Sequence, residues 1–135
     1  MATTKLLNTI LIFLFGGIGY NLIEIIWRGY THISMTIAGG LCFFIMFLIK
    51  YYLPHKKITI RALLSALFIT TIELIFGIVF NIILGMNVWD YSNAPLNILG
   101  QICLPYTALW FVISITVQWG LDMFFKSYLY GEKQS

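Results

Sequence analysis

The chain has 135 residues, of which 60% are apolar and only 10% are charged, whereas soluble domains carry about 25% charged residues. This composition excludes a soluble globular protein. Because each membrane crossing needs about 20 apolar residues, the length leaves room for about four helices and for no large extramembrane catalytic module. Eight lysines and arginines against 5 acidic residues give a net charge of +3, too small and too scattered for a nucleic-acid surface.

Four apolar runs predict four transmembrane helices, at about residues 6–27, 35–53, 62–84 and 98–125. Each run is long enough to cross a bilayer at about 1.5 Å per residue. Continuously apolar runs favour helices over strands, because an open sheet edge leaves backbone groups unsatisfied in lipid. We therefore expect an all-α integral membrane bundle of four helices, forming a single transmembrane domain over residues 1–135.

The first run carries a polar stripe. Lys5 precedes this run as in a signal peptide, but the run is long and has no clear cleavage site, so we expect it to be retained. Gly17, Asn21, Glu24 and Arg28 follow each other on one helix face, and Glu24 and Arg28 form an acid–base pair four residues apart.

The cations predict the orientation of the chain. Seven of the eight fall on one side of the predicted membrane, and only Arg28 falls on the other. The seven are Lys5, Lys50, Lys56, Lys57, Arg61, Lys126 and Lys133. By the positive-inside rule both termini are cytoplasmic, and the outer loop at residues 85–97 faces outside. We expect a multi-pass protein of the bacterial cytoplasmic membrane.

The third run carries a second polar stripe, formed by Thr70, Glu73, Gly77 and Asn81. Glu73 is about eleven residues into its run, which places it near the bilayer midplane. A charged group at that depth costs a few kcal/mol, so it needs a partner or a wet cavity. We expect the stripes of the first and third runs to meet.

The outer loop and the start of the fourth run add polar groups. Trp89 and Tyr91 suit the headgroup zone, while Asp90 and Asn93 suit turns, so we expect the loop to form an ordered lid. Pro105 should free the carbonyl of the residue four positions earlier and kink the fourth helix near its outer end.

These polar residues leave two interpretations open. They form helix-packing faces in which the acids bond to neighbouring polar side chains, or they form an outward-facing polar pocket that binds a small polar ligand or a proton. The candidate ligand-binding or proton-site residues are Glu24, Arg28, His32, Glu73, Asn81, Asp90 and Gln101.

The sequence shows no clear pattern of catalytic or metal-binding residues. His32 and His55 fall on opposite sides of the predicted membrane, and Cys42 and Cys103 lack metal-ligand spacing. The chain has no recognisable nucleophile–base set and no nucleotide motif. We expect no catalytic residues, no metal and no cofactor.

A weak internal repeat accompanies these features. An acidic motif at residues 23–25 precedes a Gly–Cys segment at residues 39–42, and a similar motif at residues 72–74 precedes one at residues 100–103. Two helical hairpins in the same orientation would form a parallel repeat. The two spacings differ by twelve residues, which leaves chance similarity equally open.

Two stretches carry a family resemblance. They are GYNLIEIIWRGYTHISMTIAGGLCFF at residues 19–44 and IELIFGIVFNIILGMNVWDYSNAPLNILGQICL at residues 72–104, the most specific part being WDYSNAPLNILGQICL. In these segments the chain resembles the CmpB/transmembrane-protein-229 family of type IV ABC-transporter permease-like proteins. The resemblance implies a multi-helix membrane fold and a link to transport, but it supplies no substrate.

Three function classes follow, in decreasing order of support. The first is a transport-related subunit, permease-like or substrate-binding, that acts in the bilayer as a homo-oligomer or with a partner subunit such as an ATPase. The second is an accessory or regulatory membrane subunit without a transport role. The weakest is a membrane-embedded enzyme, because no activated nucleophile or metal set accompanies the acids.

Overall fold

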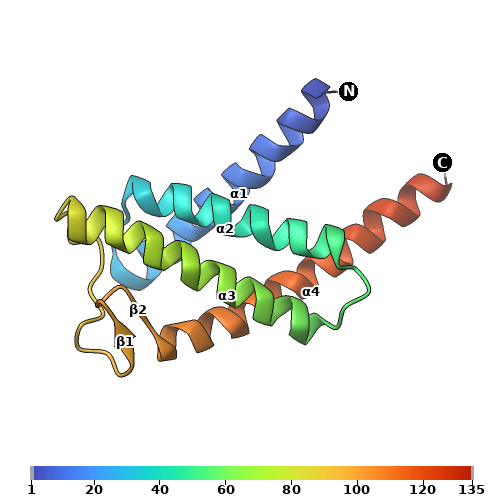
Figure 1. Ribbon diagram of the computed structural model, residues 1–135. Coiled ribbons are helices and arrows are strands. Elements are labelled where there is room, and N and C mark those ends of the chain that lie inside the picture. The colour runs from blue at the N-terminus through green and yellow to red at the C-terminus, as the bar shows by residue number, and fades with distance from the viewer. Residues whose placement is uncertain (1, 135) are drawn as a thin grey trace.

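The computed structural model describes residues 2–134, with side chains described for residues 3–126. In this range four helices are long and apolar enough to cross a membrane, which confirms the all-α membrane fold (Figure 1). The elements are α1 (Ala2–Arg28), α2 (Ile33–Tyr52), α3 (Ile58–Phe76), the π-helix η1 (Gly77–Ile83), β1 (Asn97–Ile98), β2 (Ile102–Cys103) and α4 (Leu104–Gln134).

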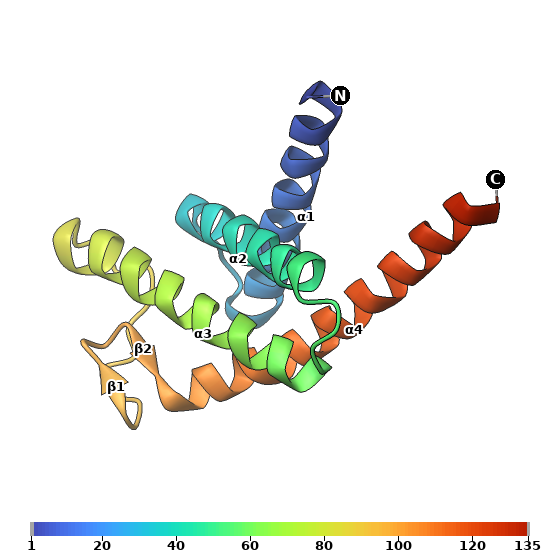
Figure 2. The ribbon, with the colours of Figure 1, turned by 45° about the vertical axis from the view of Figure 1, so that its right-hand side comes forward.

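The four helices form two hairpins, because α1 packs mainly on α2 and α3 mainly on α4, with α2 also contacting α3. The α1–α2 turn, η1 and the small sheet lie toward one end of the molecule, which we call the loop end (Figure 1). The α2–α3 turn lies toward the opposite end, which we call the turn end. The N-terminal part of α1 and the C-terminal part of α4 extend away from the other helices (Figure 2).

Small residues bring α1 and α2 into close contact. A Cβ atom on Gly39 would overlap the side chain of Tyr20, and one on Gly16 would overlap Phe43. Small residues of this kind allow two membrane helices to approach closely. Beside them, Asn21 donates a hydrogen bond from Nδ2 to the Thr36 hydroxyl at 2.7 Å.

The polar stripe of α1 therefore faces α2. A Cβ atom on Gly17 would lie 2.7 Å from the Thr36 carbonyl oxygen, and Asn21 bonds the same residue. Our expectation that this stripe meets the stripe of α3 is wrong along most of its length. The physical reason is that the glycines of α1 and α2 fit each other and leave no room for a third helix between them.

Two apolar clusters hold the hairpins together. At the loop end the buried residues are Met35, Val88 and Trp89. Toward the turn end they are Met46, Ile69 and Leu121.

The fourth helix begins at Leu104, six residues later than predicted. Residues 97–103 form a two-stranded antiparallel sheet, in which Ile98 pairs with Ile102. Leu99 and Gly100 in the turn have φ angles of +57° and +68°, a combination that suits a tight hairpin. The expected kink at Pro105 is wrong, because this residue lies in the first turn of α4, where a missing amide hydrogen disrupts no helical bond.

The sequence motifs of the weak repeat differ in structure. Residues 39–42 lie within α2, whereas residues 100–103 form the hairpin turn and β2. The two helical hairpins are present, but these two segments have no equivalent conformation.

Candidate functional site

A cavity of about 220 Å³ lies among the four helices beneath Trp89 of the outer loop. Its walls are mainly aliphatic and aromatic side chains, together with glycine backbone from α1 and α2. Glu73 of α3 is the acidic residue in the lining, and no lysine, arginine or histidine among residues 3–126 lines the cavity. The cavity is therefore an apolar chamber with a single carboxyl group.

Two aromatic donors hold the Glu73 carboxyl group. Tyr91 of the outer loop donates its hydroxyl hydrogen to Oε1 at 2.8 Å, and Trp110 of α4 donates from Nε1 to Oε2 at 3.1 Å. Each carboxyl oxygen has two lone pairs, so both oxygens keep acceptor capacity. Glu73 thus links α3, α4 and the loop.

Tyr91 is itself fixed by its surroundings. Its ring stacks on Tyr106 with centroids 4.6 Å apart and an interplanar angle of 10°. Burial raises the pKa of the Tyr91 hydroxyl above its ordinary value, and the charge of nearby Glu73 raises it further. The hydroxyl therefore stays protonated and continues to donate to Glu73.

Asn81 and Gln101 anchor the loop at the end of η1. The Asn81 side chain donates to Gln101 Oε1 at 2.8 Å and accepts from the Val88 amide at 2.6 Å. The Gln101 carbonyl oxygen accepts from Trp89 Nε1 at 3.0 Å. The Gln101 side chain covers Gly77, where a Cβ atom would lie only 2.6 Å from Oε1. Any larger residue at position 77 would displace this anchor.

Arg28 and Glu24 form the ion pair that the sequence predicts. Arg28 also donates from Nη1 to the Val88 carbonyl at 2.7 Å, and its guanidinium lies 4.7 Å from the centroid of the Tyr30 ring. These contacts tie the end of α1 to the outer loop and place Arg28 outside the cavity lining.

His32 and Asp90 stabilise local backbone. His32 caps α2, where Nδ1 accepts from the Ser34 amide at 3.1 Å. Asp90 Oδ1 accepts from the Ser92 amide at 2.9 Å, and this hydrogen bond lowers the pKa of the Asp90 carboxyl group below its ordinary value. Neither residue lines the cavity.

The structure thus separates the candidate residues into two groups. Glu73 lines the cavity, whereas the other six form hydrogen bonds and an ion pair at the loop end. The cavity is less polar than the pocket we expected, because these six residues bond one another or the backbone. The sequence reasoning did not identify Trp110 or Tyr20, which line the cavity, or the role of Tyr91 in holding Glu73. Aromatic residues are frequent in all four helices, so only the fold distinguishes these three.

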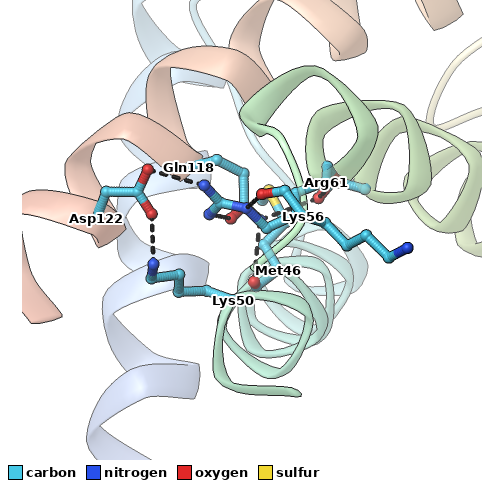
Figure 3. Close-up of polar contacts among 7 residues, drawn as sticks. Met46, Lys50, Lys56, Arg61, Gln118 and Asp122 are labelled. Atoms are coloured by element: carbon cyan, nitrogen blue, oxygen red, sulfur yellow. Dashed lines mark hydrogen bonds and ion pairs between the residues drawn. The ribbon is translucent and has the colours of Figure 1, made fainter. Parts of the chain in front are cut away.

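A second polar cluster lies at the turn end, and we call it the turn-end network (Figure 3). It comprises Lys50, Arg61, Ser65, Gln118 and Asp122, from α2, α3 and α4. From the sequence, Arg61 is one of the cations beside the α2–α3 turn, yet its side chain is buried and only 3% exposed.

Asp122 joins the two cations of this network. Its Oδ2 lies 2.8 Å from Arg61 Nη2, and its Oδ1 lies 2.7 Å from Lys50 Nζ. Gln118 accepts from Arg61 Nη1 at 2.9 Å and donates to the Met46 carbonyl at 3.0 Å. The bonds of Asp122 to Lys50 and Arg61, and those of Gln118 to Arg61 and Met46, cross from one helix to another, as the dashed lines in Figure 3 show. The network therefore joins α2, α3 and α4.

A further hollow of about 580 Å³ lies between α1 and α4, with Leu11, Phe47 and Leu121 in its lining. Among the described side chains, its lining consists of apolar residues and glycine and holds no titratable group. Within the part of the chain that the structure describes, no three His, Cys, Asp or Glu residues gather as metal ligands do. The Glu73 cavity is therefore the strongest candidate for a binding site.

A family model matches residues 35–134, and the family is described as "Putative ABC-transporter type IV", with the short name CmpB. The match covers nearly all of α2, together with α3, the outer loop and α4. The matched residues therefore include Glu73, the loop that covers its cavity, and the turn-end network. The transmembrane-protein-229 name in the resemblance has no counterpart in this match. Comparison with curated proteins and with solved structures gives no match.

Proposed function

This chain belongs to the CmpB family, whose description is "Putative ABC-transporter type IV", and we propose that it serves as a permease-like, ligand-binding membrane subunit of a transport assembly. The observation that carries the proposal is the Glu73 cavity, a partly open hollow of about 220 Å³ with one acid held by two donors. Helix packing alone gives no reason to leave an acid beside empty space in an apolar interior.

The outer loop supports this role as the cover of the cavity. Trp89 is 7% exposed and lines the chamber, while its neighbour Tyr91 bonds Glu73. Movement of this loop would break the bonds to Glu73 and uncover the chamber in one step. We propose that the loop works as a lid on the outer face of a bacterial cytoplasmic membrane, with both termini in the cytoplasm.

A partner is part of the proposal. Four helices are few for a complete translocation path, and α1 exposes large apolar side chains over most of its surface. Further copies of the chain or a different membrane subunit would complete the path, and an ATPase subunit would supply the energy.

The experiment combines purification with a cavity-blocking variant. A Cβ atom on Gly19 meets nothing within 4 Å, although this residue lines the cavity. Gly19→Leu should therefore fill the chamber without disturbing the backbone. Gly120→Leu is the matched control, because Gly120 is equally open and lies outside this cavity.

We expect the tagged chain, purified in mild detergent from its native membrane, to retain a subunit with ATPase activity. Gly19→Leu should keep this partner but fail to complement the phenotype of a deletion strain, whereas Gly120→Leu should complement it. Full complementation by Gly19→Leu would refute a role for the cavity. A partner without nucleotide-binding ability would instead favour the accessory role.

A further inference from the structure

The lining of the Glu73 cavity restricts the chemistry of its ligand. An engineered cavity of about 150 Å³ binds benzene, so a chamber of about 220 Å³ accepts a molecule slightly larger than one aromatic ring. The walls of this partly open cavity are mainly apolar side chains, with Glu73 as the acidic group. The ligand body is therefore apolar and compact.

The charge of the lining restricts the ligand further. No cationic side chain lines the cavity, and Arg28 bonds Glu24 and the Val88 carbonyl instead. An anionic ligand would meet Glu73 without a counter-ion in a medium of low polarity, which is costly. A cationic group would meet a carboxyl group whose oxygens keep free lone pairs.

Aromatic rings stand beside the carboxyl group. Tyr20 and Trp110 line the cavity with ring centroids 5.9 Å apart, and Trp89 covers it. The faces of tryptophan and tyrosine attract cations through their ring quadrupoles. The same region that holds Glu73 thus favours an ammonium group over a neutral polar group.

We infer that this cavity binds a small hydrophobic amine, with the ammonium group at Glu73 and the apolar body among the aromatic and aliphatic side chains of α1, α2 and α4. This inference rests on the proposed function, since it names the ligand class of the same cavity. Tyr91 and Trp110 are positioning residues that orient the carboxyl group toward the ligand.

Three bromophenyl probes of the same shape test the inference. They are 2-(4-bromophenyl)ethylamine, its neutral isostere 1-bromo-4-propylbenzene, and the anionic 3-(4-bromophenyl)propanoate. Bromine quenches tryptophan emission on contact, and both Trp89 and Trp110 line the cavity. The exposed Trp27 and Trp119 are replaced by phenylalanine, so that quenching reports the cavity. The full chain is used in lipid nanodiscs, and quenching in Gly19→Leu gives the background from probe dissolved in lipid.

We expect saturable quenching by the amine at a concentration at least tenfold lower than for the neutral probe, and none by the anion. Glu73→Gln should weaken amine binding at least tenfold and leave neutral-probe binding unchanged, which also shows that the variant is folded. Asp90→Asn changes an exposed acid outside the cavity and should leave the response to each of the three probes as in the wild type.

Equal binding of the amine and the neutral probe would overturn the inference, as would saturable binding of the anion or the absence of saturable binding. Unchanged amine binding in Glu73→Gln would overturn it too. The quenching measurement needs no partner subunit. If the amine binds but no ATPase partner is found and the cavity is not needed for complementation, the transport role is refuted and the ligand class stands. If Gly19→Leu fails to complement the deletion strain but the amine does not bind, the ligand class is refuted and the transport role stands.

Discussion

Arg61 illustrates how much one buried cation contributes to a membrane bundle. Its guanidinium bonds Gln118, Asp122 and the Lys56 carbonyl. Gln118 is fully buried, and a buried polar group left without its partner costs more than the hydrogen bond contributes when both groups are present. The network therefore makes the packing of α3 against α4 specific as well as stable.

Arg61→Met should lower the free energy of unfolding by roughly 1–3 kcal/mol, because it leaves the buried Gln118 side-chain oxygen without its donor and leaves Asp122 with Lys50 as its remaining cation. Asp122→Leu should also be destabilising. The loss in the free energy of unfolding of the double variant should be smaller than the sum of the two single losses by at least about 1 kcal/mol, because Arg61 and Asp122 interact directly. Unfolding in mixed detergent micelles measures all three.

Lys57→Met is the matched control for these variants. Lys57 is an exposed cation at the start of α3 without a side-chain capping bond, so its replacement should change stability by less than about 0.5 kcal/mol. Additive effects of Arg61→Met and Asp122→Leu would show that the turn-end network contributes no coupling.

Leu99, in the hairpin turn before α4, has a strained backbone conformation. It is 64% exposed and has a φ angle of +57°, a conformation that costs an L-residue roughly 1–2 kcal/mol. Leu99→Asn should therefore raise the free energy of unfolding by about 1 kcal/mol, because asparagine before glycine suits such a turn. Thermal unfolding in detergent measures the gain. Ile98→Asn, an equally exposed change at a residue of ordinary φ, should give none.

At the scale of elements, the α1–α2 interface depends on glycine. Gly39→Ala should cost about 1–3 kcal/mol, because the new methyl group overlaps Tyr20 and must push the two helices apart. Gly120→Ala introduces the same methyl group where nothing lies within 4 Å, and it should be neutral or stabilise α4 by up to about 1 kcal/mol. Thermal stability in detergent compares the two, and equal effects would show that α1 and α2 do not pack through Gly39.

The sequence predicts these helices well, because in a bilayer a long apolar run satisfies its backbone hydrogen bonds by forming a helix. It fails at residues 97–103, where Ile98, Leu99, Ile102 and Cys103 extend the fourth apolar run upstream even though Gly100 and Gln101 interrupt it. The turn at Leu99 and Gly100 depends on positive φ angles that a single glycine does not reveal. Helix ends set by loop geometry are therefore the least predictable part of this fold.

The candidate site was only partly predictable for a related reason. Depth in the membrane singles out Glu73, but hydrogen bonds between elements decide that Asn81 and Gln101 anchor a loop instead of lining a pocket. The turn-end network did have a signal that we did not use. Arg61 and Ser65, and likewise Gln118 and Asp122, are four residues apart in otherwise apolar helices, which places each pair on one face.

At the scale of the whole molecule, the turn-end network and the outer loop lie toward opposite ends, with the Glu73 cavity between them. Both sets of bonds restrain α4, the turn-end network through Gln118 and Asp122 and the loop end through Trp110. The position of α4 therefore depends on bonds at both ends of the molecule. The orientation of the chain decides which face senses the ligand.

Orientation is tested with single cysteines. Ser92→Cys in the exposed outer loop and Lys57→Cys in the exposed α2–α3 turn should label oppositely with an impermeant thiol reagent on intact cells, in a background without Cys42 and Cys103. We expect Ser92→Cys to react directly and Lys57→Cys only after permeabilisation, because seven of the eight cations lie on the side of the α2–α3 turn. Labelling of Lys57→Cys in intact cells would place the turn-end network outside. The loop over Glu73 would then face the cytoplasm, and the cavity would receive its ligand from within the cell.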